Sequence, residues 1–201
     1  MATQIIWVAP ACALLLGYLL GSIPFGVILT RLGGAGDLRQ VGSGNIGATN
    51  VLRTGRKGLA AGTVVLDIGK GVAAVLLVRH FSPGDEPLAA ASAFIGHCYP
   101  IWLRLRGGKG AATLFGVALA LHWPVGLVYA AVWLGTLAGL RVSSLASMLA
   151  ALSAPVAAAL FNRFDLVFLF LSLALILIWK HGGNIERLLA GTEPRVGRSS
   201  Q

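Results

Sequence analysis

The stretch GLAAGTVVLDIGKGVAAVLLV, residues 58–78, decides the fold because it carries only two charged side chains, Asp67 and Lys70. Its length matches the ~20 mostly apolar residues with which a helix crosses the hydrocarbon core of a bilayer. An ionised side chain at that depth costs about 2.5–3.5 kcal/mol on insertion scales, and these two stand three residues apart on one helix face. We therefore predict that Asp67 and Lys70 pair inside the protein; a direct contact between Lys70 and a ligand is the alternative.

Similar apolar runs recur along the whole chain, separated by short polar stretches. Hydrophobic residues make up 56% of the 201 residues, and charged residues make up 11%. That charged share is about half of what soluble domains contain. We predict an all-α integral membrane protein with a single domain over residues 1–201, built as a seven-helix bundle. The predicted spans are Ile5–Leu32, Gly58–Val78, Leu88–Trp102, Ala111–Leu121, Val125–Leu140, Leu145–Phe161 and Leu166–Trp179.

The first and fourth spans differ from the others. The N-terminal run lacks the basic n-region of a cleaved signal peptide. Its apolar stretch is also too long for the h-region of such a peptide, so we expect it to be retained. The run Ala111–Leu121 is short, and a half-span or one arm of a hairpin turning at His122–Pro124 is an alternative there.

The basic residues predict the orientation of the spans. Under the seven-span topology, thirteen of the 16 Lys and Arg residues lie on one side of the membrane. These are Arg31, Arg39, Arg53, Arg56, Lys57, Arg104, Arg106, Lys109, Arg141, Lys180, Arg187, Arg195 and Arg198. The positive-inside rule then puts the N-terminus outside and the C-terminus, with the glycine-rich loops, in the cytoplasm. The bilayer accounts for the net charge of +9, so no nucleic-acid partner is expected.

The first cytoplasmic loop, GSGNIGATNVLRTGRK at residues 42–57, is rich in glycine and in small polar side chains. Gly42, Gly44 and Gly47 form a G-x-G-x-x-G pattern, but no strand precedes it, so a dinucleotide fold is not indicated. Backbone N–H groups exposed by such glycines, followed by a guanidinium, suit a phosphate. The polar residues of this candidate site are Ser43, Asn45, Thr49, Asn50 and Arg53. A flexible solvated linker is the alternative.

The second loop, GHCYPIWLRLRGGKG at residues 96–110, places His97 at the inner end of a span. Lys109 is flanked by Gly107, Gly108 and Gly110, an arrangement that favours an anion site. The loop does not fit the Walker A pattern, so a nucleotide hydrolase is not expected. For Arg104 and Arg106, membrane topology alone is one explanation, and a part in the anion site is the alternative.

The tail, residues 180–198, begins with a segment that predicts a short amphipathic helix ending at Gly191. Its apolar side chains, Ile185, Leu188 and Leu189, would lie along the membrane surface. His181 and Asn184 would sit at the membrane boundary. His181 and Glu186 have the spacing of a His-x4-acid acyltransferase pair, with Glu where that motif has Asp. The commoner alternative is a histidine that lies at the membrane interface without a catalytic role.

The polar loops together indicate an anionic, phosphorylated substrate that approaches from the cytoplasm. No covalent nucleophile is evident, because Ser43 has no base beside it and Cys98 has no distinctive context. We therefore expect catalysis by positioning and electrostatics, with no metal and no cofactor. A transporter for a phosphorylated metabolite and a non-catalytic scaffold are alternatives, although transporters typically show internal repeats and none is found here.

Three segments, GSGNIGATNVLR, GHCYPIWLRLRGGKG and HGGNIERLLAGTE, resemble the motif regions of the bacterial membrane glycerol-3-phosphate acyltransferase family, which uses acyl-phosphate as donor. The likeness covers essentially the whole chain. It implies a seven-span fold in the bacterial inner membrane, with an active site facing the cytoplasm. It also implies transfer of a fatty acyl group from acyl-phosphate to the 1-hydroxyl of sn-glycerol 3-phosphate. The product would be 1-acyl-sn-glycerol 3-phosphate (lysophosphatidic acid), in the first step of phospholipid synthesis.

The resemblance also implies the roles of particular residues. The expected catalytic residues are Ser43, Arg53, Lys109, His181 and Asn184. The expected substrate-binding residues are Gly42, Ser43, Gly44, Asn45, Thr49, Asn50, Arg53, His97, Gly107, Gly108, Lys109, Gly110, His181 and Asn184. Because acyl-phosphate is an activated mixed anhydride, a phosphate oxygen of a substrate can accept the hydroxyl proton, and no side-chain base is required. The bilayer and the two substrates are the expected partners, and no protein partner is evident.

Overall fold

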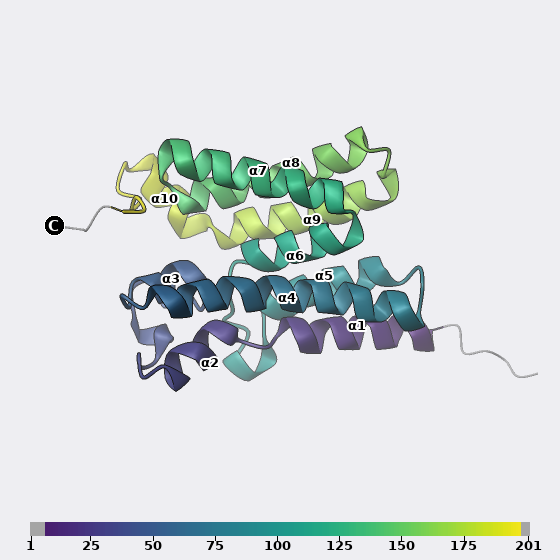
Figure 1. The fold of residues 1–201 in the computed structure, drawn as a ribbon, viewed down its shortest axis with the longest axis horizontal. Helices are drawn as coiled ribbons and strands as arrows, with labels where there is room; N and C mark the ends of the chain where they lie inside the picture. Colours follow the sequence, from purple (N-terminus) through teal and green to yellow (C-terminus); the bar gives the residue numbers. More distant parts are fainter. Residues whose placement is uncertain (1–6, 198–201) are drawn as a thin grey trace, which may run out of the picture. The chain divides into compact units, whose positions relative to one another are not determined.

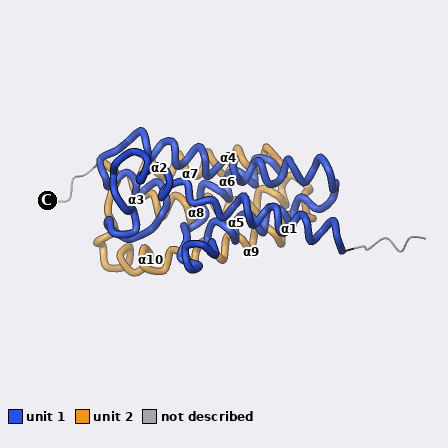
Figure 2. The backbone as a smooth tube through the Cα atoms, turned by 90° about the horizontal axis from the view of Figure 1, so that it is seen from below, with its two compact units in different colours: residues 1–121 blue, residues 122–201 orange. Residues whose placement is uncertain are grey.

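The computed structural model describes residues 7–197, so the predicted start of the first span at Ile5 and the tail residue Arg198 lie outside the described residues. Over this range the chain forms ten α-helices and two short 3-10 helices without any β-strand, which confirms the predicted all-α class. It folds into two compact units, residues 1–121 and residues 122–201 (Figure 2). The prediction of a single domain stays a prediction.

Unit 1 is built around the long helix α4. Its elements are α1 (Val8–Gly21), α2 (Phe25–Leu32), η1 (Leu38–Gln40), α3 (Ala48–Leu52), α4 (Lys57–Phe81), α5 (Glu86–Cys98), η2 (Ile101–Leu103) and α6 (Ala111–Leu121) (Figure 1). Helix α1 packs along α5, and α4 packs along α6 and α5. Helix α4 contains the whole predicted second span, and α6 has the bounds predicted for the fourth.

Close packing in unit 1 depends on small residues at the helix contacts. A Cβ added to Gly21 of α1 would lie 2.0 Å from the Ala93 carbonyl oxygen of α5. On the α4–α6 contact, a Cβ added to Gly116 would lie 2.2 Å from the Ile68 carbonyl oxygen. Glycine at such positions lets two helix backbones approach closely, as is common between helices in membranes.

The first predicted span is interrupted, which corrects the expectation of one continuous helix to Leu32. Helix α1 ends at Gly21, and α2 begins at Phe25. Pro24 lies in the break; it has no N–H to donate and disfavours the helical conformation of the residue before it. The two helices together, Val8–Leu32, still have the length and composition of one span.

The third predicted span also needs correction, because helix α5 ends at Cys98 and not at Trp102. Pro100 follows shortly after that end and disfavours a helical Tyr99. The segment then folds back on α1: the Tyr18 hydroxyl donates to the Tyr99 carbonyl oxygen at 2.9 Å, and Trp102 Nε1 donates to the Ser22 carbonyl oxygen at 2.6 Å.

Unit 2 contains three long helices and one short helix. They are α7 (Trp123–Leu140), α8 (Ser143–Leu160), α9 (Phe164–Lys180) and α10 (Gly182–Leu189). The long helices agree within two residues with the last three predicted spans. Helix α10 confirms the predicted tail helix, and Gly191 follows it with a φ of +69°, a conformation in which glycine commonly ends a helix.

The number of membrane crossings is not fixed by these helices. By length and composition, four segments in the described residues are able to cross a membrane: Val8–Leu32, Lys57–Phe81, Trp123–Leu140 and Ser143–Leu160. Helices α9 and α10 would make a fifth if taken as one span, although they are bent by 62°. Helices α5 and α6 have only 13 and 11 residues. The predicted count of seven and the predicted orientation stay predictions.

Candidate active site

The first glycine-rich loop is organised around the buried side chain of Asn50. Its Nδ2 donates to the carbonyl oxygens of Leu38 at 3.1 Å and Val41 at 2.8 Å. Its Oδ1 accepts from the Ser43 N–H at 3.3 Å and from Arg53 Nη1 at 3.4 Å. The amide therefore uses both of its donors and its acceptor within the loop. Asn50 thus contacts both Ser43 and Arg53 from the buried side of the loop; its part in a substrate site stays a prediction.

Two glycines of this loop adopt backbone conformations that other residues avoid. Gly42 has a φ of +54° and Gly44 a φ of +68°. A Cβ on Gly42 would also lie 2.7 Å from Asn50 Oδ1 and 2.8 Å from Arg53 Nη1. The turn thus depends on its glycines and on Asn50, and the side chains of Ser43 and Arg53 are exposed on it. The hydrogen bonds of Asn50 and the two glycine conformations give the loop a defined geometry.

Asn45 precedes helix α3 and Thr49 lies in its first turn; the sequence analysis did not predict this short helix. Asn45 Oδ1 accepts from the Gly47 N–H at 3.0 Å just before the helix begins. Thr49 is exposed. The hydroxyl of Thr49 is therefore accessible, whereas Asn45 has a local structural contact.

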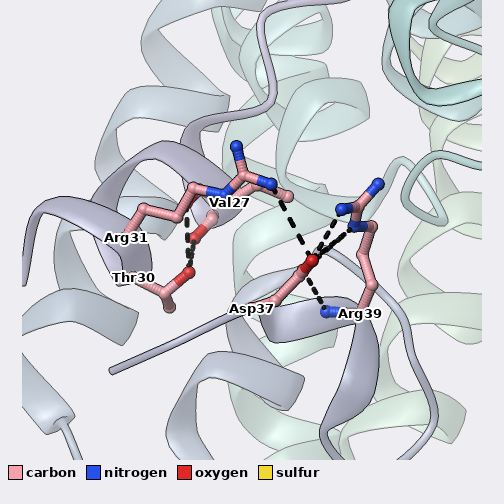
Figure 3. Close-up of polar contacts among 6 residues, drawn as sticks. Val27, Thr30, Arg31, Asp37 and Arg39 are labelled. Atoms are coloured by element: carbon pink, nitrogen blue, oxygen red, sulfur yellow. Dashed lines mark hydrogen bonds and ion pairs between the residues drawn. The ribbon is translucent and has the colours of Figure 1, made fainter. Parts of the chain in front are cut away.

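An ion cluster precedes the loop and was also missed by the sequence analysis. Figure 3 shows the guanidinium groups of Arg31 and Arg39 directed at the carboxylate of Asp37. Arg39 Nη2 donates to Asp37 Oδ2 at 2.6 Å, and Arg31 Nη2 lies 3.8 Å from the same oxygen. Hydrogen bonds from Arg39 hold the pKa of Asp37 well below its usual range. These two basic residues are therefore engaged with a carboxylate of the protein.

The second turn packs tightly on the end of α5. The N–H groups of Gly107 and Gly108 donate to the carbonyl oxygens of Cys98 at 3.1 Å and His97 at 3.0 Å. A Cβ on Gly107 would lie 2.2 Å from the His97 carbonyl oxygen, and one on Gly108 would lie 2.0 Å from His97 Nε2. These glycines thus supply space for the turn, and their N–H groups are used by α5.

Lys109 follows directly, and it is partly buried between the glycines. Gly110 has a φ of +90°, and a Cβ there would lie 2.1 Å from Phe94 Cε2. Helix α6 begins at the next residue, Ala111. The first turn of a helix has N–H groups without intrahelical partners and carries a partial positive charge. Lys109 therefore stands beside a second source of positive potential, as an anion site requires.

The predicted pair inside α4 is confirmed. Lys70 Nζ lies 2.7 Å from Asp67 Oδ1, and the two side chains are 2% and 5% exposed. His97, which the sequence analysis placed with the substrate-binding residues, is also buried. Its Nδ1 lies 3.6 Å from the same Asp67 oxygen. His97 therefore lies in the interior of unit 1, on the inner side of the second turn.

The third motif, in unit 2, is organised by Glu193, a residue that the sequence analysis overlooked. Its carboxylate accepts from Ser144 Oγ and from Asn184 Nδ2, both at 2.6 Å, and from Arg187 Nε at 2.7 Å. Burial alone raises the pKa of Glu193, but these hydrogen bonds outweigh it and the net shift is downward. The signal that could have found it is a carboxylate standing alone just beyond a helix-ending glycine.

His181 lies at the junction of α9 and α10, where its Nδ1 is 2.8 Å from the Leu177 carbonyl oxygen. His181 and Asn184 are both buried, while Glu186 is exposed. The carboxylate that the tail brings to Asn184 is thus Glu193 and not Glu186. Ser43, Arg53 and Lys109 belong to unit 1, whereas His181 and Asn184 belong to unit 2. Their action on one substrate stays a prediction, and so does the absence of a metal.

Apolar helices of membrane-spanning length, joined by polar turns built on glycine, define the class of helical integral membrane proteins. The family model described as "Glycerol-3-phosphate acyltransferase" matches residues 11–191, and the chain belongs to this family. The resemblance drawn from the three motifs is confirmed.

Individual relatives agree with the family match. The chain is 52% identical over 185 residues to a glycerol-3-phosphate acyltransferase of Mesorhizobium japonicum, covering 92% of this chain and 95% of the relative. It is 55% identical over 186 residues to one of Caulobacter vibrioides, covering 90% of this chain and 85% of the relative.

Two solved structures of PlsY (YgiH), described as an integral membrane glycerol 3-phosphate acyltransferase, share the fold. The glycerol 3-phosphate form has a TM-score of 0.88 and 36% identity, and covers 94% of this chain and 96% of that one. The lysophosphatidic acid form has a TM-score of 0.84 and 34% identity, with 94% and 95% covered.

Proposed function

We propose that the protein transfers a fatty acyl group from acyl-phosphate to the 1-hydroxyl of sn-glycerol 3-phosphate, giving 1-acyl-sn-glycerol 3-phosphate. Membership of the glycerol-3-phosphate acyltransferase family supports the acceptor and the reaction type. The observation that carries the proposal is the pair of glycine-built turns, each presenting a basic side chain, Arg53 or Lys109. Both substrates carry a phosphate, which a guanidinium or an ammonium group can bind.

The reaction needs alignment and charge stabilisation more than acid–base groups. The 1-hydroxyl oxygen attacks the acyl carbonyl carbon, the bond between that carbon and the phosphate oxygen breaks, and inorganic phosphate leaves. The hydroxyl proton passes to a phosphate oxygen. Positive groups that neutralise the departing phosphate lower the barrier without a dedicated base, and holding the hydroxyl near the carbonyl supplies the rest.

The roles proposed for the residues follow the three motifs and the contacts that position each side chain. Ser43 and Arg53, exposed on the first turn and held by Asn50, bind a substrate phosphate. Lys109, beside the start of α6, binds a phosphate and offsets the charge that develops on it. Asn184 and His181 bind the glycerol phosphate, with Asn184 oriented by its hydrogen bond to Glu193.

The reaction takes place at the cytoplasmic face of the bacterial inner membrane. The excess of Lys and Arg in the loops that carry the motifs supports this orientation. Acyl-phosphate, an amphiphile with an anionic head, would reach the protein from the same leaflet, with its chain among the lipid tails.

The donor is tested by incubating purified protein with labelled glycerol 3-phosphate and either acyl-phosphate or acyl-CoA. We expect labelled lysophosphatidic acid from acyl-phosphate alone. Product from acyl-CoA alone would reject the proposed donor, and no product from either donor would reject the enzyme.

The phosphate site is tested by comparing two exposed arginines of one loop. Arg53→Ala should lower kcat/KM by at least about 100-fold, the scale expected when a charge-assisted contact to a transferring group is lost. Arg56→Ala is the matched control, because Arg56 is equally exposed and lies three residues away. Equal activities of the two variants would remove Arg53 from the site.

A further inference from the structure

Asp67 lies at the centre of a buried contact chain within unit 1. Its Oδ1 is 2.7 Å from Lys70 Nζ and 3.6 Å from His97 Nδ1. All three side chains are at most 5% exposed, so solvent hardly weakens these interactions. The sequence predicted only that Asp67 pairs with Lys70. Asp67 also contacts His97, which belongs to another helix, α5.

One end of the contact chain reaches the break between α1 and α2. Lys70 Nζ donates to the Ile23 carbonyl oxygen at 2.9 Å and lies 5.8 Å from the centre of the Phe25 ring. Ile23 stands in the segment where Pro24 interrupts the helix, so its carbonyl is one that a helix would otherwise satisfy. Lys70 therefore fixes the break, and Asp67 neutralises the charge that Lys70 brings to this site.

The other end reaches the turn that carries Lys109. His97 meets Asp67 through Nδ1, while its Nε2 lies where a Cβ on Gly108 would be only 2.0 Å away. The Gly108 N–H also donates to the His97 carbonyl oxygen at 3.0 Å. The imidazole ring is thus held between the Asp67 carboxylate and the backbone of the turn, and a shift of the ring must shift the turn.

We propose that Asp67 is a positioning residue for phosphate binding: through His97 it holds the Gly107–Gly110 turn where Lys109 meets the phosphate of glycerol 3-phosphate. His97 acts in the same way, from inside the protein, and does not touch the substrate. A buried ion pair often adds little stability compared with an apolar replacement, so fixing one geometry is the better reason for this cluster. The inference rests on the proposed function of Lys109.

The first test separates positioning from stability. Asp67→Asn keeps the shape of the side chain and removes its charge. The KM for glycerol 3-phosphate should rise on the order of tenfold, with a smaller fall in kcat. This is the scale expected when the charge-assisted hydrogen bond between Lys109 and the phosphate is weakened. Thr63→Val is the matched control: Thr63 is buried on the same helix and donates only to the Leu59 carbonyl oxygen of its own helix. The KM of Thr63→Val for glycerol 3-phosphate should stay within about twofold of the wild-type value.

The second test compares a double variant with its two single variants, and it does not require Asp67→Asn to fold. Gly108→Ala places a methyl group against the His97 ring and should raise the KM for glycerol 3-phosphate. Adding His97→Ala removes the clash together with the ring that holds the turn, so the double variant should have a KM no higher than that of His97→Ala alone. A substrate ligand at His97 would instead make the double variant worse than either single variant.

The outcomes separate this inference from the proposed function. If the wild type makes no lysophosphatidic acid, the proposed function fails. If the wild type is active but Asp67→Asn loses only thermal stability and keeps its KM, the positioning role is overturned. A double variant whose KM lies well above those of both single variants overturns it as well.

Discussion

At the scale of residues, two polar side chains organise the motifs without being the most exposed members of them. Asn50 ties together Leu38, Val41, Ser43 and Arg53. Glu193 does the same for Ser144, Asn184 and Arg187 in the other unit. A buried polar group costs free energy unless its hydrogen bonds are made, so each of these side chains specifies one arrangement of its neighbours. The side chains proposed to meet substrate are positioned by them.

Replacing Asn50 should disturb both the stability and the activity of the protein. Asn50→Asp keeps an acceptor for Ser43 and Arg53 but loses the two donors to Leu38 and Val41. The Leu38 and Val41 carbonyl oxygens keep their backbone donors, Val41 N–H and Gly44 N–H, so the loss is that of two hydrogen bonds. Each net hydrogen bond is worth about 0.5–1.5 kcal/mol, so the midpoint of thermal unfolding should fall measurably. Thr54→Ala is a suitable control, because Thr54 makes one local bond to the Val51 carbonyl oxygen. Equal midpoints for the two variants would contradict the role of Asn50.

The Glu193 cluster predicts a pH-dependent contribution to stability. Its pKa in the folded protein lies below its ordinary value of 4.5. A lowered pKa means that the ionised form is stabilised by folding, so the contribution is present above pH 4.5 and is lost as the pH falls through the lower, folded value. The difference in melting temperature between wild type and Glu193→Gln should be largest near neutral pH and should shrink in acid. A difference that stays constant with pH would contradict this account.

At the scale of elements, sequence patterns predicted the helices better than the loops. Apolar length and turn residues were sufficient for α6 to α9, because the bilayer dictates those features. The break at Pro24 and the early end of α5 were missed, because apolar composition continues through both. Helix α3 and the contacts made by Asn50, Asp37 and Glu193 could not be predicted, since no periodicity encodes contacts between loop residues. The glycine pattern did locate both turns.

The contact between α1 and α5 should be intolerant of even one added methyl group. Gly21→Ala places a Cβ 2.0 Å from the Ala93 carbonyl oxygen, which is backbone and cannot move aside easily. Overpacking of this kind costs about 1–3 kcal/mol. Gly69→Ala on α4 is the control, because nothing lies within 4 Å of its added Cβ. The yield of folded protein and its melting temperature should fall for Gly21→Ala alone; a similar loss in both variants would argue against tight packing.

At the scale of the whole molecule, the charge distribution and the membrane orientation are linked. The loops that carry the first two motifs and the tail that carries the third hold most of the Lys and Arg residues. Positive loops are retained in the cytoplasm during insertion, which is also where glycerol phosphates and released phosphate are soluble. The predicted topology and the proposed function thus place these loops on the same side of the membrane.

Cysteine labelling in intact cells tests this orientation. In a background without Cys12 and Cys98, Pro83→Cys should react with a membrane-impermeant maleimide, because the loop after α4 is predicted to lie outside. Arg56→Cys should react only after the membrane is permeabilised. Reversed labelling of the two positions would overturn the predicted topology.

The most direct test of the proposed reaction is its stoichiometry. Purified protein with acyl-phosphate and sn-glycerol 3-phosphate should release one inorganic phosphate for each lysophosphatidic acid formed, and Lys109→Ala should lower both products together. Lysophosphatidic acid formed without release of phosphate, or phosphate released without lysophosphatidic acid, would contradict acyl transfer from acyl-phosphate.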